Sequence, residues 1–170
     1  VTLVDPATGT GTFMLGVLRR IAETVRADEG EGSVKAAIHA SIQRLIAFEM
    51  QLGPFAVAQL RILAEIVDLT GAAPATPTRM FVTDTLGNPY DDAEWLPAVL
   101  APIGKSRKDA NKIKREEPIT VVIGNPPYSI LSGNLSVSVR SMIDRYRQCE
   151  GVAIQERGAL QFEKNLQNDY

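Results

Sequence analysis

Short apolar runs alternate with longer helical patterns along the chain, and this alternation constrains the fold more than any other feature. The runs, each typical of a strand, span residues 1–4, 45–48, 80–82 and 119–123. The patterns with helical spacing or helix-forming composition span residues 13–26, 34–43, 55–69 and 137–148. Such an alternation predicts an α/β domain with about four parallel strands and helices on the faces of the sheet. Residues 88–102 lack a clear period, so a loop is expected before the last strand.

Polar residues stand at or just after the carboxyl ends of the four expected strands. They are Asp5, Glu49, Asp84 and Asn125. In open α/β sheets, ligands bind outside this edge, at the point where the strand order reverses. One acidic residue after a strand is common by chance. Four polar ends, one of them in a Gly-rich turn and another in an Asn-Pro-Pro-Tyr sequence, indicate a binding site.

The first of these ends opens the sequence Asp-Pro-Ala-Thr-Gly-Thr-Gly-Thr-Phe at residues 5–13. Gly9 and Gly11 lack a Cβ, so the backbone there can turn tightly and approach a ligand closely. The N-terminus of the following helix has free N–H groups that suit a carboxylate. A Walker phosphate loop fits poorly, because no Gly-Lys-Ser/Thr follows. A dinucleotide-binding loop and a purely structural strand–helix turn remain alternatives.

Two carboxylates follow the second and third expected strands. Glu49 lies 44 residues after Asp5, and a carboxylate there can accept hydrogen bonds from ribose hydroxyls. Asp84 can accept from an adenine amino group, and the backbone N–H of Thr85 can donate to a ring nitrogen. A solvated Glu before a helix, and a turn Asp beside Gly87, are the plainer interpretations.

The most specific signal is Asn-Pro-Pro-Tyr at residues 125–128, directly after the β-branched run. Pro126 and Pro127 fix φ and remove two backbone donors, which leaves carbonyl acceptors beside them. The side-chain carbonyl of Asn125 adds another acceptor. Together these groups suit an exocyclic amine that must become a nucleophile, and Tyr128 offers a flat face for stacking a base. The alternative is a proline-rich turn that ends a strand.

Composition restricts the class of protein. The 170 residues suffice for one domain, and no apolar run reaches the length of a membrane span. The net charge of −2 implies that any contact with nucleic acid is local rather than due to bulk charge. One cysteine, Cys149, excludes an internal disulfide and fits a cytoplasmic location, and with a single histidine, His39, no Cys/His zinc site is expected.

In this order, the motifs resemble those of the S-adenosylmethionine-dependent amino-methyltransferases, over residues 1 to about 131. The resemblance implies a partial Rossmann-like methyltransferase fold and S-adenosylmethionine as cofactor. It implies a ribose ligand at Glu49, adenine ligands at Asp84 and Thr85, and a catalytic motif of Asn125, Pro126, Pro127 and Tyr128. The residues implied for the cofactor loop are Asp5, Pro6, Ala7, Thr8, Gly9, Gly11 and Phe13.

The loop written Asp-Pro-Ala-x-Gly-x-Gly-x-Phe looks like that of DNA adenine-N6 methyltransferases from restriction–modification systems. This implies transfer of a methyl group to N6 of an adenine flipped out of double-stranded DNA, in a bacterial or phage-type cytoplasm. The tail at residues 151–170 is similar to large single polypeptides that join helicase, nuclease and methyltransferase parts. Only 41 residues separate Asp84 from Asn125, too few for a target-recognition domain, which implies a downstream one, the γ-type arrangement.

Other readings of the same motifs stay open. Methyltransferases acting on release-factor glutamine or on guanine N2 of ribosomal RNA also carry Asn-Pro-Pro-Tyr or a close variant. Their cofactor loops resemble Asp-x-Gly-x-Gly-x-Gly more closely. Cytosine-N4 enzymes more often have Ser in place of Asn125. A non-catalytic fragment that keeps the fold is an alternative from another class.

Residues 1–170 are expected to form the N-terminal half of a catalytic domain, because a complete sheet of this family has about seven strands and four can be placed. The first residue already lies in the strand before the cofactor loop, which leaves no room for the family's upstream cofactor segment. Made alone, the chain is expected to bind S-adenosylmethionine weakly at best and to leave DNA unmethylated.

One basic segment remains without a role in these motifs. Residues 105–115 hold six of the 18 Lys and Arg residues and a single acid, Asp109. Such a segment can neutralise phosphates near an active site. A solvated surface helix or loop is the plainer interpretation.

Overall fold

The computed structural model describes residues 1–91, 97–126, 137–146, 148–149 and 152–153. Within it the chain divides into two compact units. The first comprises Val1–Thr85 and Pro89–Asn125, and the second comprises Leu86–Asn88 and Pro126–Tyr170. The expected sheet and the first three polar strand ends all lie in the first unit, as does Asn125.

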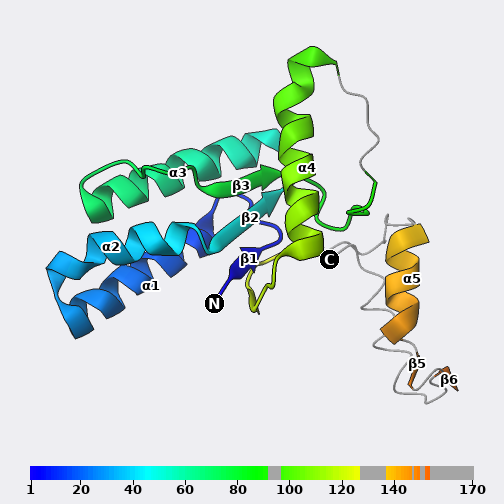
Figure 1. The fold of residues 1–170 in the computed structure, drawn as a ribbon, viewed down its shortest axis with the longest axis horizontal. Helices are drawn as coiled ribbons and strands as arrows, with labels where there is room; N and C mark the ends of the chain where they lie inside the picture. Colours follow the sequence, from blue (N-terminus) through cyan, green and yellow to red (C-terminus); the bar gives the residue numbers. More distant parts are fainter. Residues whose placement is uncertain (92–96, 127–136, 147, 150–151, 154–170) are drawn as a thin grey trace. The chain divides into compact units, whose positions relative to one another are not determined.

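The sheet of the first unit has four parallel strands in the order β3-β2-β1-β4, of which Figure 1 labels β1, β2 and β3. The strands are β1 (Leu3–Asp5), β2 (Leu45–Glu49), β3 (Arg79–Val82) and β4 (Val121–Val122). The chain adds strands outward from β1 to β3 and then returns to the other side of β1. The strand order therefore reverses between β1 and β4, which makes their carboxyl ends the topological switch point of the sheet.

Helices connect the strands throughout. They are α1 (Thr12–Glu29), α2 (Glu31–Ile42), α3 (Leu52–Thr70) and α4 (Ala101–Glu116), with a 3₁₀ turn η1 (Ala98–Leu100) before the last. Gly30, with a φ of 89°, separates α1 from α2, between the helical patterns expected at residues 13–26 and 34–43. The prediction of a loop between the third and fourth strands is wrong for Ala101–Glu116, because these residues form the helix α4.

The two faces of the sheet carry separate cores, as shown by the alternation along β2. Leu45 and Ala47 pack with α1, α2 and α3, whereas Ile46 and Phe48 pack with Ala110 and Ile113 of α4 (Figure 1). Successive side chains of a strand point to opposite faces, so a strand covered on both faces is apolar throughout. This explains why residues 45–48 form an unbroken apolar run.

The buried face of α1 is offset from its most regular apolar stripe. Phe13, Val17, Ile21 and Val25 recur every four residues, yet Phe13 is 39% exposed and the other three are only partly buried. The fully buried positions of α1 are Met14, Leu15, Leu18 and Ala22. This stripe thus lies at the border of the core, and the side chains of Met14, Leu15, Leu18 and Ala22 lie nearer its centre.

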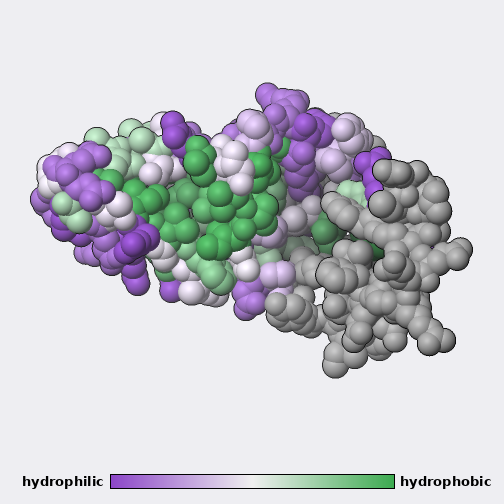
Figure 2. All heavy atoms as spheres, turned by 90° about the horizontal axis from the view of Figure 1, so that it is seen from below, coloured by the Kyte–Doolittle hydropathy of each residue, from purple (hydrophilic) through white to green (hydrophobic). Residues whose placement is uncertain are grey.

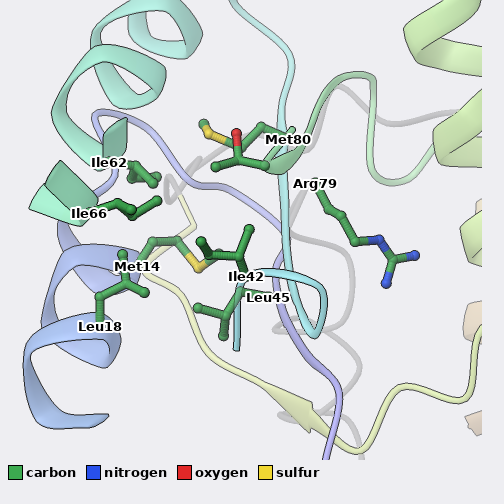
Figure 3. Close-up of a pocket in the computed structure, with 9 residues that line it drawn as sticks. Met14, Leu18, Ile42, Leu45, Ile62, Ile66, Arg79 and Met80 are labelled. Atoms are coloured by element: carbon green, nitrogen blue, oxygen red, sulfur yellow. The ribbon is translucent and has the colours of Figure 1, made fainter. Parts of the chain in front are cut away.

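A small apolar cavity of about 20 Å³ lies where α1, α2 and α3 meet the strands (Figure 3). Met14, Leu18, Ile62 and Ile66 are among its lining side chains. Its size and apolar lining make it a packing defect of the core rather than a ligand site. In Figure 3 the guanidinium of Arg79 points away from it, and this group donates to both carboxylate oxygens of Glu117 at 3.1 and 3.0 Å.

The strand β4 forms a free edge of the sheet in the described part of the chain. It is shorter than the expected run at residues 119–123, because the N–H groups of Thr120 and Val121 both donate to the carbonyl of Thr2. Val121 and Val122 are 38% and 67% exposed. Seen from below, the first unit presents a continuous hydrophobic surface (Figure 2).

In the second unit the structure describes α5 (Val137–Tyr146) and a two-stranded antiparallel sheet of β5 (Gln148–Cys149) and β6 (Val152–Ala153). The helix α5 agrees with the expected pattern at residues 137–148 over Val137–Tyr146, whereas Gln148 belongs to β5. Neither short strand was expected, because a two-residue strand has too few positions to show a period.

Candidate active site at the carboxyl edge of the sheet

The expected polar strand ends lie at one edge of the sheet. Asp5 and Glu49 are the last residues of β1 and β2, as predicted. Asp84 lies two residues after the end of β3, and Asn125 three residues after the end of β4. Because all four strands are parallel, their carboxyl ends share this edge, and β1 and β4 flank the switch point.

The Gly-rich loop between β1 and α1 is held by hydrogen bonds from its neighbours. The N–H of Thr8 donates to the carbonyl of Phe48 at 2.9 Å, and the guanidinium of Arg61 donates to the carbonyl of Thr10 at 2.7 Å. Gly9 and Gly11 have φ values of 55° and 85°, in the left-handed region that favours glycine. A Cβ on Gly11 would lie 3.3 Å from the Cβ of Ala58, whereas one on Gly9 would meet open space. The two glycines therefore differ in role: Gly11 packs against α3, and Gly9 leaves room at the surface of the loop.

Asp5 is a buried carboxylate with one unused oxygen. The residue is 0% exposed, and its Oδ1 accepts from the N–H of Ala7 at 3.1 Å. Its Oδ2 has no hydrogen-bond partner among the described residues. Burial raises the pKa of Asp5 to about 6; the Ala7 hydrogen bond opposes this rise and the charge of Glu49 adds to it. A buried carboxylate oxygen without a partner is costly, so this position is suited to a ligand that brings a donor or a positive charge.

Glu49 joins the loop to the start of α3. Its Oε2 accepts from the N–H of Gly9 and its Oε1 from the N–H of Gln51, both at 2.8 Å. The side chain is half-buried, and each oxygen keeps lone-pair capacity for one more donor. The carboxylate thus supports the glycine loop and can still accept from a ligand.

At Gly124, the carboxyl end of β4 lies close to the carboxyl end of β1. A Cβ on Gly124 would lie 2.8 Å from Oδ1 of Asp5 and 3.2 Å from Cδ of Pro6. Any larger residue there would require the side chain of Asp5 or the neighbouring main chain to shift. Asn125 follows, exposed, at this edge. Pro126 is half-buried at the start of the second unit, and Pro127 and Tyr128 lie outside the described residues.

The segment after β3 is tied to the same edge. The hydroxyl of Thr85 donates to the carbonyl of Pro6, which links this segment to the loop after β1. The carboxylate-bearing residue Asp84 is exposed, and its main-chain carbonyl accepts from Nζ of Lys114. The Thr85 side chain therefore has a structural contact in addition to the backbone role expected of it.

Sequence reasoning missed Gly124, Lys114 and Arg61. Gly124 had a readable signal, since a glycine at the end of a β-branched run often marks a close backbone approach. Nothing in the sequence distinguishes Lys114 from the other basic residues of its segment, or Arg61 from a surface residue of α3.

The basic segment at residues 105–115 is helical, which agrees with the surface helix named in the plainer interpretation. All of it lies in α4, as a charged helix with one buried side. Lys114 and Arg115 donate to main-chain carbonyls, of Asp84 and Pro89, and Lys112 forms an ion pair with Glu116 at 4.0 Å. At least these three cations thus have contacts within the protein.

Two other features, a metal cluster and a membrane span, are absent from the described residues. No group of three or more His, Cys, Asp or Glu side chains among them is placed to hold a metal ion. None of the helices in the described ranges is long and apolar enough to cross a membrane.

Comparisons with known proteins show a shared fold. No family model and no curated protein matches the chain. Among solved structures, a nuclease-deletion mutant of the Type ISP restriction-modification enzyme LlaGI, in complex with a DNA substrate mimic, matches 97% of the chain at 24% identity and a TM-score of 0.68. The ATP-dependent Type ISP restriction-modification enzyme LlaBIII bound to DNA matches 98% at 24% identity and 0.68. DrdV in a DNA complex matches 98% at 24% identity and 0.61.

The chain corresponds to a small part of each of these proteins. It spans 14% of the length of the LlaGI chain, 11% of LlaBIII and 16% of DrdV. At this identity the likeness establishes the fold alone: the described residues, with their parallel four-stranded sheet, share an α/β fold with a segment of much longer chains.

Proposed function

We propose that this chain is the cofactor-binding and N-terminal catalytic part of a DNA adenine-N6 methyltransferase from a restriction–modification system. The observation that carries the proposal is the contact at the switch point. There the Gly-rich loop after β1 and the Gly-Asn sequence after β4 meet, through Asp5 and Gly124. A loop suited to a cofactor and a motif suited to an amine thus adjoin, as methyl transfer between them requires.

The residues present fit S-adenosylmethionine. The unused Oδ2 of Asp5 and the open space at Gly9 offer a carboxylate and a close approach beside the N-terminus of α1. Glu49 keeps acceptor capacity for ribose hydroxyls, and the carboxylate of Asp84 is exposed for an adenine amino group. When bound, this cofactor would supply the methyl group from its sulfonium.

The residues after β4 would act on the target base. The side-chain oxygen of Asn125 and the carbonyl of Pro126 accept hydrogen bonds from the adenine amino group, which localises the nitrogen lone pair for attack. The ring of Tyr128 stacks on the flipped base. Catalysis would then consist of positioning and electrostatic stabilisation of the reacting amine by these residues.

The choice of DNA as substrate rests on the loop sequence and on the solved structures with this fold. LlaGI, LlaBIII and DrdV were all solved as DNA complexes, and the first two are restriction-modification enzymes. The same comparison supports a longer polypeptide as the working enzyme, since the chain covers 11–16% of the length of these proteins. Target recognition, and helicase and nuclease parts, are proposed to lie outside residues 1–170.

The test is to incubate the full-length protein with labelled S-adenosylmethionine and mixed-sequence duplex DNA, and to identify modified nucleosides by mass spectrometry. N6-methyladenine at a defined site is expected. The Asn125→Ala variant should lower the methylation rate by on the order of 100-fold and change the cofactor Kd little, because the lost acceptor acts on the reacting amine.

Parallel reactions with release-factor protein, ribosomal RNA and cytosine-containing duplexes distinguish the alternatives. Label in glutamine, guanine or cytosine, with none in adenine, would reassign the substrate. Cofactor binding without transfer to any substrate would make the chain a non-catalytic module, and absence of cofactor binding would end the proposal.

A further inference from the structure

One half-buried lysine contacts the segment that follows β3. Lys114 lies in the last turn of α4, and its Nζ donates to the main-chain carbonyl of Asp84 and, at 3.4 Å, to Oγ1 of Thr83. The ammonium also lies 5.8 Å from the centroid of the Phe48 ring, within the range of a cation–π interaction. Lys114 therefore bridges α4 to the carboxyl ends of β2 and β3.

The segment after β3 depends on contacts of this kind, because it forms neither a helix nor a strand. Main-chain groups outside helices and strands must find other partners, and an irregular loop keeps one conformation only where such partners fix it. Here the partners come from two sides. The Thr85 hydroxyl donates to the carbonyl of Pro6, and the Arg115 guanidinium to that of Pro89. Lys114 provides the contact at Asp84 itself.

The environment of Lys114 indicates that the contact is costly to maintain. Burial lowers the pKa of this lysine, and the charge of Asp84 opposes the change. Other basic residues of α4, such as Lys112, remain exposed. The partly buried ammonium finds its shortest contact at the main-chain carbonyl of Asp84, which offsets part of the cost of burial and holds that carbonyl in place.

We propose that Lys114 is a positioning residue for the cofactor site, which sets the orientation of Asp84 by holding its main-chain carbonyl. This inference rests on the proposed function, in which the Asp84 carboxylate binds the adenine amino group. Lys114 touches neither the cofactor nor the target base in this scheme. Its effect on binding passes through Asp84.

The test uses Lys114→Met in the full-length protein, because methionine keeps an apolar stem on Phe48 and removes the donors. The exposed Lys112→Met, on the same helix, is the matched control. In calorimetry with S-adenosylmethionine, Lys114→Met should raise the Kd about tenfold, as expected for loss of a charge-assisted hydrogen bond. Lys112→Met should leave the Kd unchanged.

A double-mutant cycle separates positioning from a general structural effect. In an Asp84→Ala background, Lys114→Met should raise the Kd no further, because the carboxylate that it orients is gone. The same tenfold increase in both backgrounds would overturn the proposal, as would equal Kd values for the Lys114→Met and Lys112→Met variants.

Hydrogen exchange without any ligand makes the result independent of the proposed function. Peptides covering residues 83–90 should exchange faster in Lys114→Met than in the wild-type protein or Lys112→Met. If the wild-type protein fails to bind S-adenosylmethionine, the proposed function falls, and this measurement still decides whether Lys114 holds the segment. Unchanged exchange there would show that it does not.

Discussion

Gly124 has less room for a Cβ than Gly9 or Gly11, the other glycines of the candidate site. An alanine Cβ would lie 2.8 Å from Oδ1 of Asp5, so the buried Asp5 side chain or the main chain beside it would have to move. We expect Gly124→Ala to lower the free energy of unfolding by about 1–3 kcal/mol, the usual cost of overpacking, and to reduce methylation. Urea denaturation of the variant gives the first quantity.

Gly16→Ala is the control for this substitution. Gly16 lies exposed within α1, and an added Cβ there meets nothing within 4 Å. Alanine should stabilise the helix by about 0.5–1 kcal/mol. Similar effects at both positions would show that the contact between Gly124 and Asp5 has no energetic consequence.

Asp5 is expected to lower the free energy of unfolding as the pH rises, which is the opposite of the usual effect of a carboxyl group. Its pKa is raised from 3.8 to about 6 by burial, so the folded state binds the proton more tightly than the unfolded state does. The contribution of Asp5 to stability is therefore greatest at low pH, and it declines as the pH rises from about 4 through 6. In Asp5→Asn this decline should disappear.

The measurement is the difference in unfolding free energy between the wild-type protein and Asp5→Asn at several pH values. Taking the difference removes the opposite trend from groups such as Glu117, whose pKa is lowered by its hydrogen bonds from Arg79. A difference that stays constant between pH 4 and 7 would contradict a raised pKa at Asp5.

The residues at strand ends were predictable, but their environments were not. Apolar runs ending in a polar residue placed Asp5 and Glu49 correctly, since the run itself fixes where a strand stops. The unused oxygen of Asp5 and the need for glycine at position 124 depend on how closely β4 approaches β1. That distance is a tertiary property, which a local pattern cannot contain.

Among the elements, α3 is one of the three helices that form the core on its face of the sheet. Ile66 is fully buried and lines the apolar cavity of about 20 Å³. Ile66→Ala should enlarge this cavity and lower the free energy of unfolding by about 2–5 kcal/mol. The adjacent Val67, exposed on the same helix, is the matched control, and Val67→Ala should change stability by less than about 0.5 kcal/mol.

The elements that the sequence predicted well are those with strong apolar patterns. The run in β2 and the helices α1, α2 and α3 were predicted to within a few residues. The helix α4 was missed as a helix because only Ala110, Asn111 and Ile113 are buried along its 16 residues. The side of α4 that faces the sheet is formed partly by the aliphatic stem of Lys114, and a hydropathy pattern counts lysine as polar.

At the scale of the whole molecule, the free edge of the sheet is the exposed surface of most consequence. Among the described residues β4 has no strand on its outer side and presents Val121 and Val122 to solvent, and such an edge is a template for pairing with another chain. We therefore expect the 170-residue chain, made alone, to associate as its concentration rises.

Val122→Lys should reduce this association, because a charge on an edge strand opposes pairing. Val99 is even more exposed but lies in the 3₁₀ turn η1, so Val99→Lys is the matched control. Light scattering against concentration measures the effect. Equal reduction by both substitutions would point to net charge rather than the edge as the cause.

The way the glycine loop is held has a kinetic consequence. Its main chain is fixed by Phe48, Glu49 and Arg61 from β2 and α3 without any ligand. A ligand arriving there meets a preorganised surface, and little conformational entropy remains to be lost on binding. Association should therefore proceed in one concentration-dependent phase, with no slow rearrangement of the loop after the encounter.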